Sequence, residues 1–154
     1  MGRLFDAVAA VLGVRDRVNY EGQAAIELEH CADLAETGAY RAALNGTAGF
    51  TVAGGDIVDA VVADLRASVP VPVIAARFHN GVAALVVDAA SRIRSQTGLG
   101  TVALSGGVFQ NMLLLDRAVS GLEGAGFDVL THHRVPPNDG GISLGQAAVA
   151  TARG

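Results

Sequence analysis

Glycine pairs and oxygen-bearing side chains come together in two short stretches of this chain, and that combination suits the binding of phosphate. In the first, Ser105-Gly106-Gly107 follows a short apolar run and precedes apolar residues at helical spacing. Backbone N–H groups at the start of a helix attract anions, and glycine lets a phosphate approach them closely. Asn111 follows one helical turn later, where its amide could reach a ligand in the loop. A tight turn without a ligand is the simpler alternative for a glycine pair taken alone.

The second stretch, PPNDGG at residues 136–141, places a carboxylate beside another glycine pair. Asp139 could cap the helix that follows, which is the more common role for an aspartate in this position. It could instead bind a divalent cation that holds phosphates, because Mg²⁺ prefers hard oxygen ligands. The presence of two glycine-rich loops favours the second interpretation.

Glutamates form a third candidate group in the stretch YEGQAAIELE, residues 20–29. Glu27 lies on a predicted helix that begins at Gly22, and its carboxylate could accept hydrogen bonds from ribose hydroxyls. The alternative is a favourable interaction of these glutamates with the helix dipole.

The histidines do not have the spacing of a transition-metal site. His79 lies in an apolar helical stretch, where a buried structural histidine is the more common outcome. His132 and His133 are adjacent near the end of a predicted strand and should point to opposite faces. No H-x-x-x-H or C-x-x-C spacing occurs, and no nucleophile–base pair can be assembled, so no catalytic side chain is assigned.

Apolar periodicity predicts the helices and strands that must position these residues. Gly13 and Gly38 should end the first two helices, Asp56 should cap the third, and VPVP at 69–72 should separate the third from the fourth. The predicted helices are at about 3–12, 22–36, 54–65, 74–97, 109–124 and 141–152. The predicted strands are at 40–44, 49–52, 101–104 and 127–131, with NGTA at 45–48 as a turn between the first two.

The order strand, helix, strand between residues 101 and 131 predicts a parallel β–α–β unit, and hence a single α/β domain over residues 1–154. Parallel strands end at the same edge of a sheet, so both glycine loops should lie where α/β proteins bind ligands. Few strands are predicted for an α/β domain of this length. Either some strands escape detection or the chain is part of a larger domain.

Composition excludes several functions. The chain has 11 arginines and no lysine, and a Walker-type phosphate loop needs a lysine. The net charge of −4 and the lack of a basic patch argue against a nucleic-acid partner. The single cysteine fits a reducing compartment, and neither a signal peptide nor an apolar run of about 18 residues is evident. We therefore expect a cytoplasmic protein with no membrane span.

Five stretches resemble, in order, the C-terminal part of the hydrogenase maturation carbamoyltransferase family, HypF. They are GRLFDAVAAVLGV, YEGQAAIELE, ARFHNGVAALV, VALSGGVFQNMLLL and VPPNDGGISLGQAA. Related families are O-carbamoyltransferases and, more remotely, the tRNA threonylcarbamoyladenosine transferases. The resemblance implies one lobe of an actin/Hsp70-like (ribonuclease H-like) ATPase fold, helix-rich with a short parallel β–α–β core.

The same resemblance implies a reaction. Family members use carbamoyl phosphate and ATP to form a carbamoyl-adenylate, and they pass the carbamoyl group to an acceptor. In HypF the acceptor is the C-terminal cysteine of the protein HypE, and the product serves the nickel–iron hydrogenase centre. An aminoglycoside hydroxyl and a tRNA adenosine intermediate are the acceptors of the related families.

The resemblance also assigns roles to residues. Gly106, Gly107 and Asn111 would line the nucleotide site. Gly22 and Glu27 would contact adenosine. Asp139 would ligate the divalent metal that holds the phosphates.

The family's H-x-x-x-H metal motif and a further aspartate belong to the preceding subdomain, and this chain has neither. We therefore expect carbamoyl transfer only together with an N-terminal lobe that shares the metal. The alternative is a catalytically incomplete nucleotide-binding or interaction module. An apolar surface should be exposed where the lobes meet, and it should favour self-association of the isolated chain.

Overall fold

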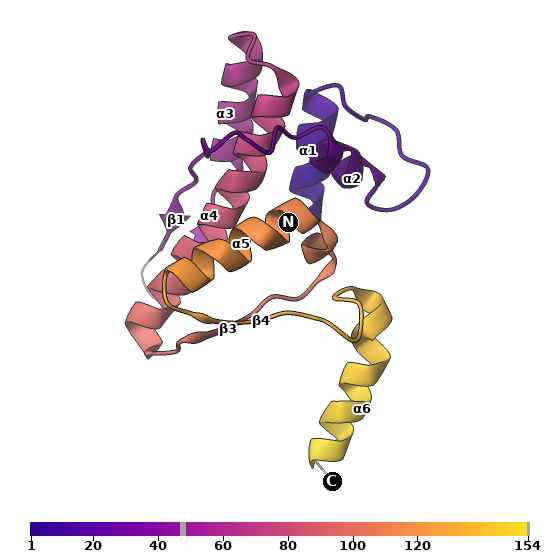
Figure 1. Ribbon diagram of the computed structural model, residues 1–154, viewed down its shortest axis with the longest axis vertical. Coiled ribbons are helices and arrows are strands. Elements are labelled where there is room, and N and C mark those ends of the chain that lie inside the picture. The colour runs from indigo at the N-terminus through magenta and orange to yellow at the C-terminus, as the bar shows by residue number, and fades with distance from the viewer. Residues whose placement is uncertain (47–48, 154) are drawn as a thin grey trace.

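The long helix α4, Val71–Thr97, is the centre of the computed structural model, which describes residues 1–46 and 49–153 (Figure 1). Nine of its 27 residues are buried, and they include Ile74, Phe78 and Val82 at helical spacing. The helix follows Pro70 and carries a second proline in its first turn, where no backbone donor is lost. Gly98 ends it in the left-handed conformation, with φ of 76°.

By length and composition alone, α4 could cross a membrane, which the search for apolar runs did not anticipate. Half of its most apolar window is nevertheless buried inside the protein. It also contacts α2, α3 and α5. These contacts give α4 the position of a core helix.

Three helices surround the N-terminal part of α4 (Figure 1). They are α1 (Gly2–Val11), α2 (Gln23–His30) and α3 (Gly54–Arg66). Their apolar faces meet in one core, in which the rings of Phe5 and Phe78 pack edge to face with centroids 4.8 Å apart.

The second half of the chain forms the predicted parallel β–α–β unit. Strand β3 (Thr101–Ala103) pairs with β4 (Asp128–Leu130), and α5 (Met112–Gly124) connects them and packs on α4. A second pair, β1 (Leu44–Asn45) with β2 (Thr51–Val52), is antiparallel. The prediction of a helix-rich α/β chain is therefore confirmed.

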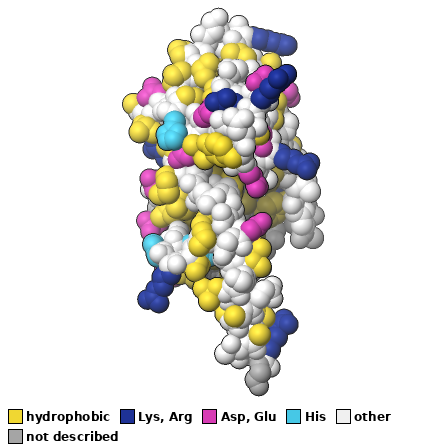
Figure 2. All heavy atoms as spheres, turned by 90° about the vertical axis from the view of Figure 1, so that its right-hand side faces the viewer, with side chains coloured by type: hydrophobic (Ala, Val, Ile, Leu, Met, Phe, Trp, Pro, Cys, Tyr) yellow, Lys and Arg dark blue, Asp and Glu magenta, His cyan; other side chains and the backbone are white. Residues whose placement is uncertain are grey.

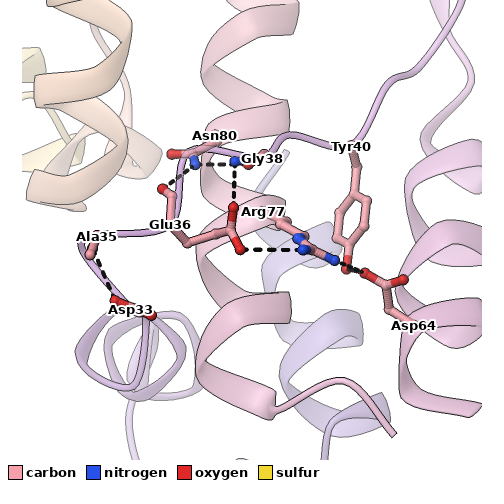
Figure 3. A network of polar contacts seen from close by, with 8 residues as sticks. All are labelled: Asp33, Ala35, Glu36, Gly38, Tyr40, Asp64, Arg77 and Asn80. Atoms are coloured by element: carbon pink, nitrogen blue, oxygen red, sulfur yellow. Dashed lines mark hydrogen bonds and ion pairs between the residues drawn. The ribbon is translucent and has the colours of Figure 1, made fainter. Parts of the chain in front are cut away.

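The predicted helix at 22–36 is too long, and the strand at 40–44 is largely wrong. Helix α2 ends at His30, and the following segment runs along α4 instead (Figure 3). The side-chain amide of Asn80 donates to the carbonyls of Glu36 and Gly38 at 3.0 and 2.9 Å, and the N–H of Tyr40 donates to the carbonyl of Arg77 at 3.2 Å. Hydrogen bonds to α4 thus replace those of a regular element.

Gly81 explains how this segment comes so close to α4. A Cβ at this position would lie 2.6 Å from the carbonyl oxygen of Tyr40. Beside it, Asp64 accepts hydrogen bonds from the Tyr40 hydroxyl at 2.7 Å and from Arg77 at 2.9 Å (Figure 3). These two donors lower the pKa of Asp64.

Several predicted boundaries shift by a few residues. Residues 107–110 form a separate 3-10 turn, η1 (Gly107–Gln110), and α5 begins after it. A second such turn, η2 (Asp139–Gly141), precedes α6 (Ile142–Arg153). Asp56 lies in the first turn of α3 but is not its cap, because its carboxylate accepts the N–H of Ala43 at 3.1 Å. Part of the predicted turn at 45–48 lies outside the described residues.

Helix α6 projects away from the rest of the molecule (Figure 1). None of its residues is buried. Ile142, Leu144 and Val149 are each about half exposed, and Figure 2 shows apolar side chains on this projecting end and on the face above it. Helix α6 therefore exposes apolar side chains, and its contact with another lobe stays a prediction.

Candidate functional site

A cleft of about 1000 Å³ lies between the N-terminal helices and the two glycine-rich turns. Four of the six residues that the sequence singles out line it, namely Gly22, Gly107, Asn111 and Asp139. The other lining residues are Met1, Gly2, Arg3, Phe5, Asp6, Glu21, Ala25, Ile26, Glu29, Val108, Gln110 and Asn138.

The two glycine loops lie side by side, as the parallel strands predict. The N–H of Gly106 donates to the carbonyl of Pro137 at 2.8 Å, which joins one loop to the other directly. Gly106 has a φ of 101°, a conformation that a side chain would strain. It shapes the turn from β3 into η1, although it does not itself line the cleft.

The turn after Gly106 carries backbone N–H groups without acceptors, on residues that line the cleft. Within the described residues, the N–H groups of Gly107 and Val108 have no acceptor, whereas the N–H of Phe109 donates to the carbonyl of Gly106. Both residues line the cleft. Adjacent free N–H groups beside glycine are suited to an anionic oxygen.

Asn111 is a buried residue whose amide holds two helices in place. Its Oδ1 accepts the N–H of Leu114 at 2.8 Å, which caps α5, and its Nδ2 lies 3.0 Å from Nε2 of His79 on α4. Asn111 lines the cleft with 6% of its surface exposed, and both polar atoms of its side chain have hydrogen-bond partners within the protein.

His79 is a satisfied core residue, which is the outcome that the sequence favoured. Its Nδ1 donates to the carbonyl of Ala75 at 2.7 Å, and its Nε2 accepts from Asn111. These partners require the neutral ring with the proton on Nδ1. Burial lowers the pKa of His79, because a charged imidazole would lose its hydration.

Glu27 does not line the cleft. It forms a two-pronged ion pair with Arg15, at 2.8 Å to Nε and 2.5 Å to the terminal nitrogen, and it accepts from Gln23 at 2.9 Å. The hydrogen bonds from Arg15 and then Gln23 lower the pKa of Glu27. Its contact with adenosine stays a prediction.

Glu29 is the glutamate of α2 that lines the cleft. Its Oε1 accepts the N–H groups of Met112 and Leu113, at 2.7 and 3.1 Å, so a carboxylate of α2 covers the start of α5. Sequence reasoning passed over this residue as part of a glutamate cluster. No local pattern could have revealed a partner 83 residues away.

Asp139 does not cap a helix. Asn138 performs that role, because its Oδ1 accepts the N–H of Gly140 at 3.0 Å. The Asp139 carboxylate is exposed at the cleft, with no hydrogen bond or ion pair to the described part of the chain. Across the described residues, no three His, Cys, Asp or Glu side chains converge on a metal position. Asp139 can therefore supply one ligand but not a complete site.

The charges of the cleft are mostly negative. Asp6, Glu21, Glu29 and Asp139 line it, against one guanidinium from Arg3. A phosphate group would meet repulsion here unless a cation accompanied it.

His132 and His133 both line a different groove, between α5 and β4. Strand β4 ends at Leu130, so the alternation expected of a strand does not extend to them. His132 Nε2 lies 2.9 Å from Oγ of Ser105, which is a spacing that sequence reasoning did not foresee. No acidic group within the described residues orients the ring, so the pair lacks the third member of a catalytic triad.

Comparison with known proteins gives consistent matches over nearly the whole chain. The family described as "Carbamoyltransferase, Kae1-like Domain, second subdomain" matches residues 1–146. Carbamoyltransferase HypF of Synechocystis is 37% identical over 95% of this chain and 18% of its own length. The HypF of Rhodobacter capsulatus is 40% identical over 99% of this chain and 19% of its own.

Solved structures agree with these matches. A crystal structure of full-length HypF in its phosphate- and nucleotide-bound form has a TM-score of 0.93 and 43% identity, over 97% of this chain and 20% of that one. HypF of T. kodakarensis has a TM-score of 0.82 and 27% identity, over 96% and 19%. The chain thus spans about a fifth of the length of these relatives.

Proposed function

Because the chain belongs to the HypF carbamoyltransferase family, as the second subdomain of its Kae1-like domain, we propose that it supplies one half of a carbamoyl-transfer site. In this proposal ATP and carbamoyl phosphate yield a carbamoyl-adenylate, and the carbamoyl group serves nickel–iron hydrogenase maturation. The observation that carries the proposal is the meeting of Gly22, Gly107, Asn111 and Asp139 in one cleft.

The cleft offers different chemistry to the two ends of a nucleotide. The free N–H groups of Gly107 and Val108 suit phosphate oxygens. The α2 side of the cleft carries Gly22, Ala25 and Ile26, where small and apolar groups leave room for a nucleoside. Gly22 has a φ of 82°, and no other atom would lie within 4 Å of a Cβ there.

A divalent cation belongs to this proposal for an electrostatic reason. Four carboxylates face one arginine in the cleft, so phosphates need a positive partner. Asp139 is the proposed ligand from this chain, since its carboxylate is exposed and has no partner in the described residues. The remaining ligands would come from elsewhere, because no three donors converge here.

The other half of the site would be an N-terminal lobe, so that the two together form the actin/Hsp70-like ATPase fold. Exposed apolar residues give such a lobe a surface to cover, above all Ile142, Leu144 and Val149 on α6. A HypE-like protein would be the carbamoyl acceptor, and we expect the reaction in the cytoplasm without a direct nucleic-acid partner.

A second candidate is a nucleotide-binding or interaction module with no turnover. The lack of three convergent metal donors in the described residues favours it. The two candidates differ in one respect, because only the first predicts carbamoyl-phosphate-dependent ATP consumption when the other lobe is added.

The test mixes the 154-residue chain with the first subdomain of a HypF carbamoyltransferase, and it measures ATP consumption that depends on carbamoyl phosphate. We expect activity from the pair and none from either part alone. Asp139→Ala should lower it by on the order of 100-fold, because the phosphates lose a cation ligand. Asp116→Ala is the matched control, since Asp116 is exposed on α5 beside the other groove.

Activity of the chain alone would contradict the half-site. An unchanged rate in Asp139→Ala would remove the metal role of that residue. Nucleotide binding by the pair, with no consumption of ATP, would favour the module without turnover.

A further inference from the structure

The first turn of α5 borders the cleft, and its backbone N–H groups already have partners. Glu29 accepts those of Met112 and Leu113, and Asn111 accepts that of Leu114. These are N–H groups that a helix leaves without acceptors of its own. An anion in the cleft therefore cannot use them while Glu29 keeps its position.

Glu29 also connects two walls of the cleft that are far apart in the sequence. Helix α2, which carries it, contributes Ala25 and Ile26 to one wall, whereas Asn111 lies at the corner between η1 and α5. Hydrogen bonds from N–H groups to a carboxylate are roughly twice as strong as those to a neutral acceptor. The contact thus fixes the spacing of the two walls, and His79 anchors the corner from the other side through Asn111.

We propose that Glu29 is a positioning residue of the cleft, which holds α2 against the start of α5 so that a nucleotide meets both walls at once. The inference rests on the proposed function, since the ligand is the adenine nucleotide named there. Glu27 does not share this role, although it lies two residues away on the same helix, because its carboxylate is paired with Arg15.

A positioning role and simple electrostatics predict opposite changes in nucleotide affinity when Glu29 is removed. A carboxylate repels phosphate, so removal of its charge alone should tighten nucleotide binding. Loss of the contact with α5 should instead let the walls separate and weaken binding. Glu21 provides the matched control, because it lines the same cleft and no hydrogen bond joins its side chain to α5 in the described residues.

The experiment titrates the 154-residue chain with ADP and Mg²⁺ and follows the backbone amide signals by NMR. Glu29→Ala should weaken ADP binding by on the order of tenfold, since small misplacements of a site are costly. Glu29→Gln keeps a carbonyl acceptor, so it should lose less affinity for ADP than Glu29→Ala does. Glu21→Gln should bind ADP as tightly as the wild type or more tightly. Before ADP is added, the Met112 and Leu113 signals should move in Glu29→Ala and stay in place in Glu21→Gln.

Equal or tighter ADP binding in both Glu29 variants would overturn the positioning role, and Glu29→Gln alone decides if Glu29→Ala does not fold. If the wild type shows no ADP binding even with the first subdomain of a HypF carbamoyltransferase added, the proposed function fails and the role of Glu29 with it. The ligand-free signals of Met112 and Leu113 would then still show whether Glu29 holds α5, so the two failures are distinguishable.

Discussion

Helices α4 and α6 are both rich in apolar residues, yet they have opposite surroundings. Nine of the 27 residues of α4 are buried, whereas none of the 12 residues of α6 is. Helix α4 contacts α2, α3 and α5, whereas α6 projects from the rest of the molecule (Figure 1). The difference shows that the chain builds its own core around α4, and it is consistent with our proposal that another lobe covers α6. The predictions below test this division.

The largest effect should come from a methyl group added to α4. In Gly81→Ala the new Cβ would lie 2.6 Å from the carbonyl oxygen of Tyr40, and the backbone there cannot move without losing its hydrogen bond to Arg77. Overpacking of this kind costs about 1–3 kcal/mol in the free energy of unfolding. Urea-induced unfolding followed by circular dichroism would measure it.

Gly145→Ala is the matched control on α6. Nothing lies within 4 Å of a Cβ at this position, so the methyl group should not clash. We expect a change of less than about 0.5 kcal/mol in global unfolding, because a surface position is altered. A loss as large as that of Gly81→Ala would mean that α6 is part of the core, and the comparison between the helices would collapse.

A smaller effect, on the pH dependence of stability, should come from the buried imidazole ring of His79 on α4. Burial lowers the pKa of His79, so at mildly acidic pH the unfolded chain binds a proton at this ring that the folded chain does not bind. Stability should therefore be complete above the unfolded pKa of about 6.5 and fall as the pH drops below it. The slope from this one group is at most about 1.4 kcal/mol per pH unit.

Urea titrations at pH 7.5 and pH 5.5 would measure this slope, and His79→Gln should flatten it. Asp64 and Glu27 do not interfere, because both have lowered pKa values and stay ionised in this window. An identical slope in His79→Gln would show that the ring is not the group that senses pH.

The sequence predicted well those features that depend on local periodicity. The β3–α5–β4 unit follows from it, and so does the adjacency of the two glycine loops, because parallel strands impose it. The buried state of His79 also followed from its apolar neighbours. In each case the residues that decide the outcome are close in the sequence.

Features that depend on distant partners could not be predicted. The end of α2 at His30 and the extended path beside α4 follow from bonds between Asn80 and the carbonyls of Glu36 and Gly38. Which of the two glutamates lines the cleft likewise depends on distant partners, because Glu27 pairs with Arg15 and Glu29 bonds to the start of α5. Both glutamates lie on one short helix, and only their tertiary contacts distinguish them.

The most direct test of the division between α4 and α6 is amide hydrogen exchange, measured with and without the first subdomain of a HypF carbamoyltransferase. In the chain alone, α6 should exchange quickly and α4 slowly, since exchange follows local stability. Addition of the first subdomain should slow exchange in α6 and around Gly22 and Gly107, and it should leave α4 unchanged. Binding of that subdomain with α6 still exchanging quickly would contradict the account.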